Sequence, residues 1–171
     1  MGKAWYMSET IVDQRKECHR SPPEFCGLEK LAEIGIIYRH IPAHEKDAGL
    51  ERACAEQGYD HWDEIIINRE KLPNYDAKIK NFFQEHMHPD DEARYVVDGT
   101  GFFDVRDKED RWIRILAQAG DLIILPSGIY HRFTVDDNDY LKAVRLFKGI
   151  PVWTAYLREE GGEDTFVRHD D

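Results

Sequence analysis

Residues 85–107, EHMHPDDEARYVVDGTGFFDVRD, decide the fold class because short apolar runs alternate in them with turn residues. The runs ARYVV and GFFDVRD stand on either side of an Asp98-Gly99 turn signal. The pattern starts near Ile79 with KIKNFFQEHMH and continues after residue 107 through RWIRILA, LIILP, YHRFTV and YLKAVRLF. Turn signals spaced about 8–12 residues apart are typical of an all-β barrel or sandwich. We therefore predict a mainly β chain whose barrel strands begin at Ile79.

The residues before this region predict a flank of short helices and strands. Apolar spacing predicts a helix over residues 28–34 that Gly35 ends, and a second helix over residues 45–57 that Gly58 ends. The run Ile65–Ile67 fits a strand or a helix equally well, because it is short and uniformly apolar.

The length of the chain predicts its domain organisation. At 171 residues it has the size of one domain. We predict a single domain over residues 1–171, with the flank at 1–78, the barrel core at 79–156 and a tail at 157–171. The tail is charged and contains glycine, so we expect it to dock against the core or to fray.

Composition excludes several classes of protein. The net charge of −11 opposes binding to nucleic acid, which needs clustered lysine and arginine. No apolar stretch has the length of a membrane span, and the first residues lack the apolar core of a secretory signal. Cys18, Cys26 and Cys54 are odd in number and lack CxxC spacing, which predicts reduced thiols. We expect a soluble, cytoplasmic protein without membrane insertion.

A group of metal-ligand side chains is the main functional signal. His86 and His88 are one residue apart, so in a β-strand their side chains project to the same face. Glu92 and Arg94 share that parity if the strand continues without a bulge. His131 follows a Gly- and Pro-containing turn further along the chain. Three imidazoles and one carboxylate suit a divalent first-row metal with open coordination positions.

The spacing of these residues resembles the two motifs of the cupin superfamily. The first runs His86-x-His88, three residues, Glu92, six residues, Gly99, and the second runs Gly120, five residues, Pro126-x-Gly128, two residues, His131. Lys80 and Val135 depart from the general pattern, but neither position supplies a ligand. The resemblance implies a cupin-type β-barrel, a double-stranded β-helix or jelly roll, with short flanking α-helices on the N-terminal side.

A narrower resemblance extends from AWYM at residues 4–7 to about Tyr156. The segments LPNYDAKIKNFF, RWIRI, LPSGIYHRFTVD and AVRLFKGIPVWTAY are similar to those of the acireductone dioxygenases of methionine salvage. This resemblance implies that one metal ion per chain is bound by His86, His88, Glu92 and His131. It also implies that Arg94 faces the substrate and that two aromatic residues line the pocket, which are Phe82 and Phe133.

The resemblance implies a specific reaction. Members of the family take acireductone, 1,2-dihydroxy-3-keto-5-(methylthio)pentene, and molecular oxygen. With iron(II), Fe²⁺, they yield formate and 2-keto-4-methylthiobutyrate; with nickel(II), Ni²⁺, they yield carbon monoxide, formate and 3-(methylthio)propionate. Animal relatives are described as binding the cytoplasmic tail of a membrane-type metalloprotease and as entering the nucleus. We expect a monomer.

Other functions fit the same residues. Another metal cupin, such as an isomerase or a thiol dioxygenase, could use the same ligands. A regulatory protein-interaction module could keep the fold and the metal without the reaction. Intact ligands and Arg94 favour an enzyme over such a module.

The remaining charged residues predict no further site. Glu85, Asp90 and Asp91 flank the ligands, and we expect mainly solvated loop charges or partners that orient the imidazoles, with a direct metal ligand among them as the alternative. The alternating charges of residues 104–114 predict a solvated hairpin. The other histidines lie outside any ligand pattern; they are His19, His40, His44, His61 and His169.

Overall fold

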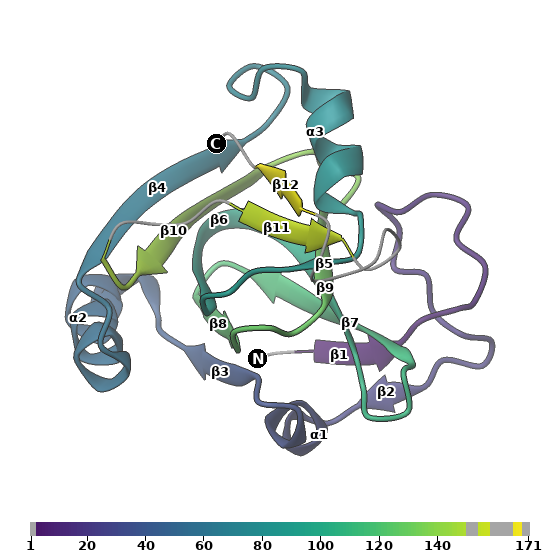
Figure 1. Ribbon diagram of the computed structural model, residues 1–171, viewed down its shortest axis with the longest axis horizontal. Coiled ribbons are helices and arrows are strands. Elements are labelled where there is room, and N and C mark those ends of the chain that lie inside the picture. The colour runs from purple at the N-terminus through teal and green to yellow at the C-terminus, as the bar shows by residue number, and fades with distance from the viewer. Residues whose placement is uncertain (1–2, 150–153, 158–165, 169–171) are drawn as a thin grey trace.

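The computed structural model describes residues 3–149, 154–157 and 166–168, and most of their regular secondary structure consists of antiparallel strands (Figure 1). The strands are β1 (Lys3–Tyr6), β2 (Phe25–Cys26), β3 (Ile37–His40), β4 (His61–Ile67), β5 (His86–Met87), β6 (Glu92–Arg106), β7 (Trp112–Gln118), β8 (Asp121–Leu125), β9 (His131–Val135), β10 (Leu141–Phe147), β11 (Thr154–Leu157) and β12 (Phe166–Arg168). The helices are α1 (Leu28–Glu33), the 3-10 helix η1 (Ala43–Glu45), α2 (Lys46–Gln57) and α3 (Tyr75–Phe82).

Two curled sheets share the long strand β6. One sheet has the order β12-β11-β5-β9-β6-β7-β1-β2, and the other has the order β3-β8-β6-β10-β4. The first residues of β6 pair with β8 and β10, and its last residues pair with β7 and β9. The helices lie at the periphery of the sheets (Figure 1). This architecture confirms the predicted mainly β, cupin-type fold with short helices.

The Asp98-Gly99 prediction of a turn between two strands is wrong, because β6 is continuous through both residues. Gly99 has a φ of +83°, and the pairing with β10 shifts register beside it, between Lys142 and Ala143. A positive φ and a register shift both bend a strand. The glycine therefore lets β6 pass from one sheet into the other instead of ending it.

The prediction that strands begin at Ile79 is also wrong, since Ile79 and Phe82 belong to helix α3. Tyr75 and Ile79 are buried and stand four residues apart, which is the spacing of one helix face. The strand that follows, β5, has only two residues, and the chain leaves it before Pro89. Strand pairing resumes at Glu92, so the premise of one continuous strand across the ligands does not hold.

The N-terminal flank follows the sequence more closely. Helices α1 and α2 occupy the predicted positions, and the glycines that follow them, Gly35 and Gly58, have φ values of +88° and +79°. The run Ile65–Ile67 belongs to strand β4, which pairs with β10. Within the described residues, no helix combines the length and the apolar composition that a membrane span requires.

The C-terminal tail contributes one described strand, β12, which pairs with β11. Strand β11 in turn pairs with β5, next to His86. Residues 158–165 and 169–171 of the predicted tail, including His169, lie outside the described residues.

The hairpin of residues 104–114 is exposed at its tip, residues 108–110, as predicted, but its two end residues are fully buried. Asp104 and Arg114 both have an exposed fraction of 0% and form an ion pair of 2.8 Å. The N-terminal segment covers them: Arg114 Nη1 donates hydrogen bonds to the carbonyls of Gln14 and Lys16. In the hairpin alone these two charges would face solvent. In the folded chain the N-terminal segment covers them.

Candidate metal centre

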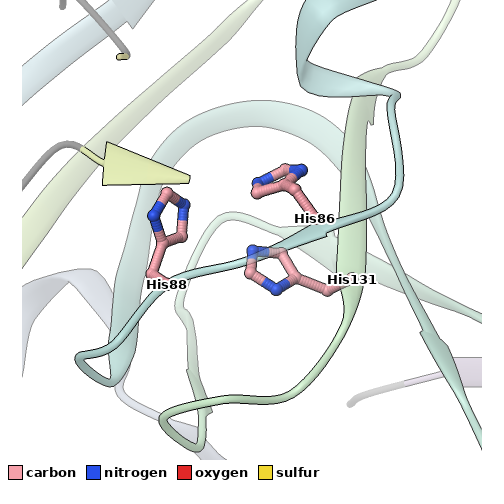
Figure 2. Close-up of side chains that lie close together, drawn as sticks. All are labelled: His86, His88 and His131. Atoms are coloured by element: carbon pink, nitrogen blue, oxygen red, sulfur yellow. The ribbon is translucent and has the colours of Figure 1, made fainter. Parts of the chain in front are cut away.

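Three histidines from two distant parts of the chain form a compact group. One ligand atom from each of His86, His88 and His131 lies within 4.8 Å of the others. Figure 2 shows the three rings gathered in one place, with His86 and His88 on the same segment and His131 on a separate strand. Direct pairing of β5 with β9 causes this, since His86 and His131 are cross-strand partners. The group brings together three of the four predicted ligands.

Glu92 lies at the edge of the histidine group. As the first residue of β6, it places Oε2 at 3.4 Å from His131 Nε2 and Oε1 at 3.7 Å from His88 Nε2. The guanidinium of Arg94 lies on its other side, with Nη2 at 3.4 Å from Oε1. Glu92 and Arg94 share a face of β6 because they are two residues apart. The predicted carboxylate therefore reaches two of the histidines, and the predicted arginine contacts that carboxylate.

Backbone carbonyls orient two of the imidazoles. The Nδ1 atom of His86 lies 2.6 Å from the carbonyl oxygen of Gln84, and that of His131 lies 3.0 Å from the carbonyl oxygen of Ile129. A carbonyl oxygen only accepts hydrogen bonds, so Nδ1 carries the proton in both rings and Nε2 presents its lone pair. Sequence reasoning missed these acceptors because every residue has a carbonyl group, and only the folded chain decides which one faces a ring.

The Nε2 atom of His131 supports a metal at this position. It is buried and has no hydrogen-bond partner of adequate geometry among the described residues. A buried polar atom without a partner costs free energy, and a metal ion would remove that cost. Imidazole nitrogens together with a carboxylate oxygen suit a divalent first-row ion. The residues present therefore fit a metal.

Burial and the neighbouring charges set the protonation of the group. Burial lowers the pKa of His86 well below its ordinary value, and His131 lowers it further. Burial alone would raise the pKa of Glu92, but the charges of Arg94 and His131 outweigh it and hold that pKa well below its usual range. Burial acts to lower the pKa of His131, but the Glu92 carboxylate outweighs this effect and raises it. Without a metal, His131 therefore takes up a proton more readily than His86 does.

A pocket with mostly apolar walls opens beside the histidines. Its apolar lining residues come from β4, α3, β6, β9 and β10, and include Ile65, Ile67, Phe82, Val96, Phe103, Phe133 and Leu141. Phe82 and Phe133 form an edge-to-face pair with ring centroids 6.2 Å apart. The two predicted aromatic residues thus meet in this pocket, although helix α3 supplies one and strand β9 the other.

The pocket also holds a second arginine that sequence reasoning missed. Arg145 lines it and is the cross-strand partner of Arg94. Both Nε and Nη2 of Arg145 donate to Asp63, at 2.8 and 2.6 Å. The parity of β10 alone would have placed Arg145 on an inner face, but the pairing with β6 was needed to place it opposite Arg94.

Two of the flanking acids, Asp91 and Glu85, form contacts with residues other than the three histidines. Asp91 accepts hydrogen bonds from the Tyr59 hydroxyl and the Ser127 amide, at 3.3 and 2.9 Å. Glu85 pairs with Arg106, and its side chain is only 8% exposed, so it is not the solvated charge that its loop position predicted. The remaining described histidines lie away from the group: His19 stacks on Trp5, and the others pair with carboxylates; they are His40, His44 and His61.

Burial raises the pKa of all three thiols, so none is an activated nucleophile. The three cysteines are free, as predicted.

Comparison with known proteins identifies the family. The model of the ARD/ARD′ family matches residues 3–155. The chain belongs to the ARD/ARD′ family. Acireductone dioxygenase 1 of Physcomitrium patens is 56% identical over 160 residues, which cover 92% of this chain and 82% of that protein. Acireductone dioxygenase of Homo sapiens is 52% identical over 160 residues, covering 92% of this chain and 89% of that protein.

A solved structure supports the same assignment of fold. Acireductone dioxygenase from Bacillus anthracis, with a cadmium ion in its active center, superimposes with a TM-score of 0.68 at 26% identity. The superposition covers 74% of this chain and 86% of that one. The resemblance to the ARD/ARD′ family that the motifs indicated is confirmed.

Proposed function

We propose that this chain is the acireductone dioxygenase of methionine salvage, cleaving acireductone with molecular oxygen. The observation that carries the proposal is the joint geometry of the histidine group, Glu92 and Arg94 beside an apolar pocket. Because the chain belongs to the ARD/ARD′ family, we propose acireductone as its substrate.

Four side chains would hold the metal: His86, His88, Glu92 and His131. A bound divalent ion would supply Lewis-acid stabilisation of the negative oxygens of the deprotonated substrate. We propose one ion per chain, iron(II) or alternatively nickel(II). With iron(II) we expect formate and 2-keto-4-methylthiobutyrate, and with nickel(II) carbon monoxide, formate and 3-(methylthio)propionate.

Arg94 would bind the enediolate. Its guanidinium is charged at every relevant pH, and its side chain is 17% exposed beside Glu92. A hydrogen bond from this group to a substrate oxygen would strengthen in a dry pocket, because the local dielectric constant is low. Arg94 Nη1 also donates to the carbonyl of Ala93 at 3.1 Å, which limits its rotation.

Phe82 and Phe133 would exclude water and receive the methylthio end of the substrate. Their rings form part of an apolar wall with Phe103, whose centroid lies 4.9 Å from that of Phe133. Thioether sulfur packs favourably beside aromatic rings. The substrate would therefore lie with its charged oxygens toward Arg94 and its apolar tail toward these rings.

The reaction itself is tested on metal-loaded protein. The apoprotein is loaded with iron(II) or nickel(II) and supplied with acireductone under oxygen. Formate with the keto acid, or carbon monoxide with nickel, is the expected result. Metal-loaded protein that consumes no oxygen with acireductone would exclude the proposal and favour another metal cupin reaction or a regulatory module.

Arg94→Ala separates substrate binding from metal binding. Loss of one charged donor to a developing anion typically lowers kcat about 100-fold, so we expect that loss with a full complement of metal. Arg39→Ala is the control, since Arg39 forms an exposed pair with Glu56 at 3.1 Å far from the histidines in the fold, and its turnover should equal that of the wild type. Unchanged activity in Arg94→Ala would remove this residue from the reaction.

The oligomeric state, the protein partner and the cellular location of this chain stay predictions. These are a monomeric state, binding to the cytoplasmic tail of a membrane-type metalloprotease, and a cytoplasmic location with entry into the nucleus. Gel filtration, pull-down with the tail peptide and imaging of the tagged chain test them separately.

A further inference from the structure

Strand β5 carries the proposed metal ligand His86 but is too short to fix its position through backbone pairing alone. It has two residues, and its pairing with β9 is the single pair His86–His131. On its other side it pairs with β11 through His86 and Met87. A strand this short gains little positional restraint from its backbone ladder. The position of His86 must therefore depend on side-chain contacts as well.

Glu85 supplies such a contact on the face opposite His86. Its carboxylate accepts two hydrogen bonds from Arg106, from Nε to Oε2 at 2.7 Å and from Nη2 to Oε1 at 3.1 Å. Such a bidentate pair fixes orientation as well as distance. Because adjacent residues of an extended chain point to opposite sides, holding Glu85 outward also holds His86 inward.

Arg106 is itself well fixed at the end of β6. Its Nη1 donates to the carbonyl of Asp110 at 2.8 Å, and its guanidinium lies 4.3 Å from the ring centroid of Trp112. Both contacts belong to the hairpin between β6 and β7. The guanidinium is thus restrained by the hairpin on one side and holds Glu85 on the other.

The same tryptophan reaches the residue next to His131. The guanidinium of Arg132 lies 3.8 Å from the Trp112 ring centroid, and its Nε donates to Asp104 at 2.8 Å. Trp112 therefore contacts both Arg106 and Arg132. Arg106 pairs with Glu85, which precedes His86, and Arg132 directly follows His131. The outer face of the sheet links the two segments whose inner face carries the ligands.

We propose that Arg106, acting through Glu85, is a positioning residue of the metal centre that sets His86 against His131. The inference rests on the proposed metal-binding function, but it concerns residues that touch neither metal nor substrate. Residues that orient ligands from outside typically change metal affinity 10- to 100-fold when replaced. We expect an effect of about 10-fold, because Arg106 acts through one intervening residue.

The chain offers a matched control on the same hairpin. Arg111 forms a similar pair with Asp107, from Nε and Nη2 to Oδ2 at 2.9 Å each, and its guanidinium lies 4.6 Å from the Tyr6 ring centroid. Its side chain is 34% exposed and that of Arg106 is 25% exposed. The control pair connects the hairpin to β1, which carries no ligand.

The test measures cobalt(II) binding to apoprotein, by dissociation constant and visible absorption spectrum, together with the Tm of each apoprotein. Arg106→Met keeps the apolar stem and removes the charge; it should weaken cobalt(II) binding about 10-fold and alter the spectrum. Arg111→Met should lower the Tm comparably and leave both cobalt(II) readouts unchanged. Glu85→Gln should reproduce Arg106→Met, and the double variant should be no worse than either single variant.

Equal losses of cobalt(II) affinity in Arg106→Met and Arg111→Met would overturn the proposal, since they would indicate general stabilisation by the hairpin. An unchanged spectrum and affinity in both Arg106→Met and Glu85→Gln would overturn it too, as would a wild type that binds no cobalt(II). Where Arg106→Met fails to fold, Glu85→Gln carries the test. A wild type that binds cobalt(II) tightly but never converts acireductone would defeat the proposed reaction and leave this inference standing.

Discussion

His131 is the residue whose environment depends most on a bound ion. Its Nδ1 atom is satisfied by the Ile129 carbonyl, while its Nε2 atom is buried without a hydrogen bond and faces the Glu92 carboxylate at 3.4 Å. Glu92 stabilises a positive charge there, whether a proton on His131 or a metal ion. A proton and a metal ion therefore compete for the Nε2 atom of His131.

This competition predicts a pH-dependent metal affinity. The pKa of His131 is raised above its ordinary value, so the metal must displace a proton already at pH values above about 6.5. We expect the dissociation constant for cobalt(II) to rise about tenfold for each pH unit below that raised pKa, as one proton is displaced. Isothermal titration between pH 8 and pH 5.5 measures it.

Glu92→Gln provides the contrast for this titration. Removing the carboxylate weakens cobalt(II) binding at every pH, and it also removes the main cause that raises the pKa of His131. The onset of the pH dependence should therefore move to lower pH in the variant. A wild-type affinity that stays constant from pH 7.5 to pH 6 would contradict the proton competition.

Strand β6 is the element on which the site depends, because it is a member of both sheets. Its first part carries Glu92 and Arg94, and its last part carries Asp104 and Arg106. Gly99 separates the two parts at the bend. A Cβ atom there would lie 2.4 Å from the carbonyl oxygen of Tyr140, on a backbone with a φ of +83°.

Gly99→Ala should therefore destabilise the chain by about 2–4 kcal/mol, from left-handed backbone strain together with the clash. Gly149→Ala is the matched control, because Gly149 also has a positive φ of +65° but no atom within 4 Å of the added Cβ. It should cost only the strain, about 1–2 kcal/mol. Urea unfolding of both variants gives the comparison; equal losses would show that the bend tolerates a Cβ atom.

At the scale of the whole molecule, buried charges connect the N-terminal segment to the barrel. Asp104 accepts hydrogen bonds from both Arg114 and Arg132. Arg114 also donates hydrogen bonds to the carbonyls of Gln14 and Lys16. Arg114 and Gln14 are 100 residues apart in the chain. Through this contact the N-terminal segment covers the outer face of the sheet, behind the strand that carries His131.

Asp104→Ala should lower the free energy of unfolding by about 3–5 kcal/mol, because it leaves two guanidinium groups buried without their shared carboxylate. Asp137→Ala removes an exposed pair with Lys16, 49% and 59% exposed, and should leave the free energy of unfolding almost unchanged. Urea unfolding measures both. A loss below about 1 kcal/mol for Asp104→Ala would mean that water enters and solvates the two arginines.

The sequence by itself determined the strands from residue 112 to residue 147, because alternation and turn spacing are local properties, and the spacing of the two motifs identified the residues that gather at the centre. It did not determine helix α3, the break between β5 and β6, or the burial of Asp104 and Arg114. Those depend on partners far along the chain. The tertiary structure alone chose the Gln84 and Ile129 carbonyls that orient the imidazoles and placed Arg145 opposite Arg94. A charged side chain is buried, or a carbonyl faces a ring, only when another segment packs against it, and no local pattern records that contact.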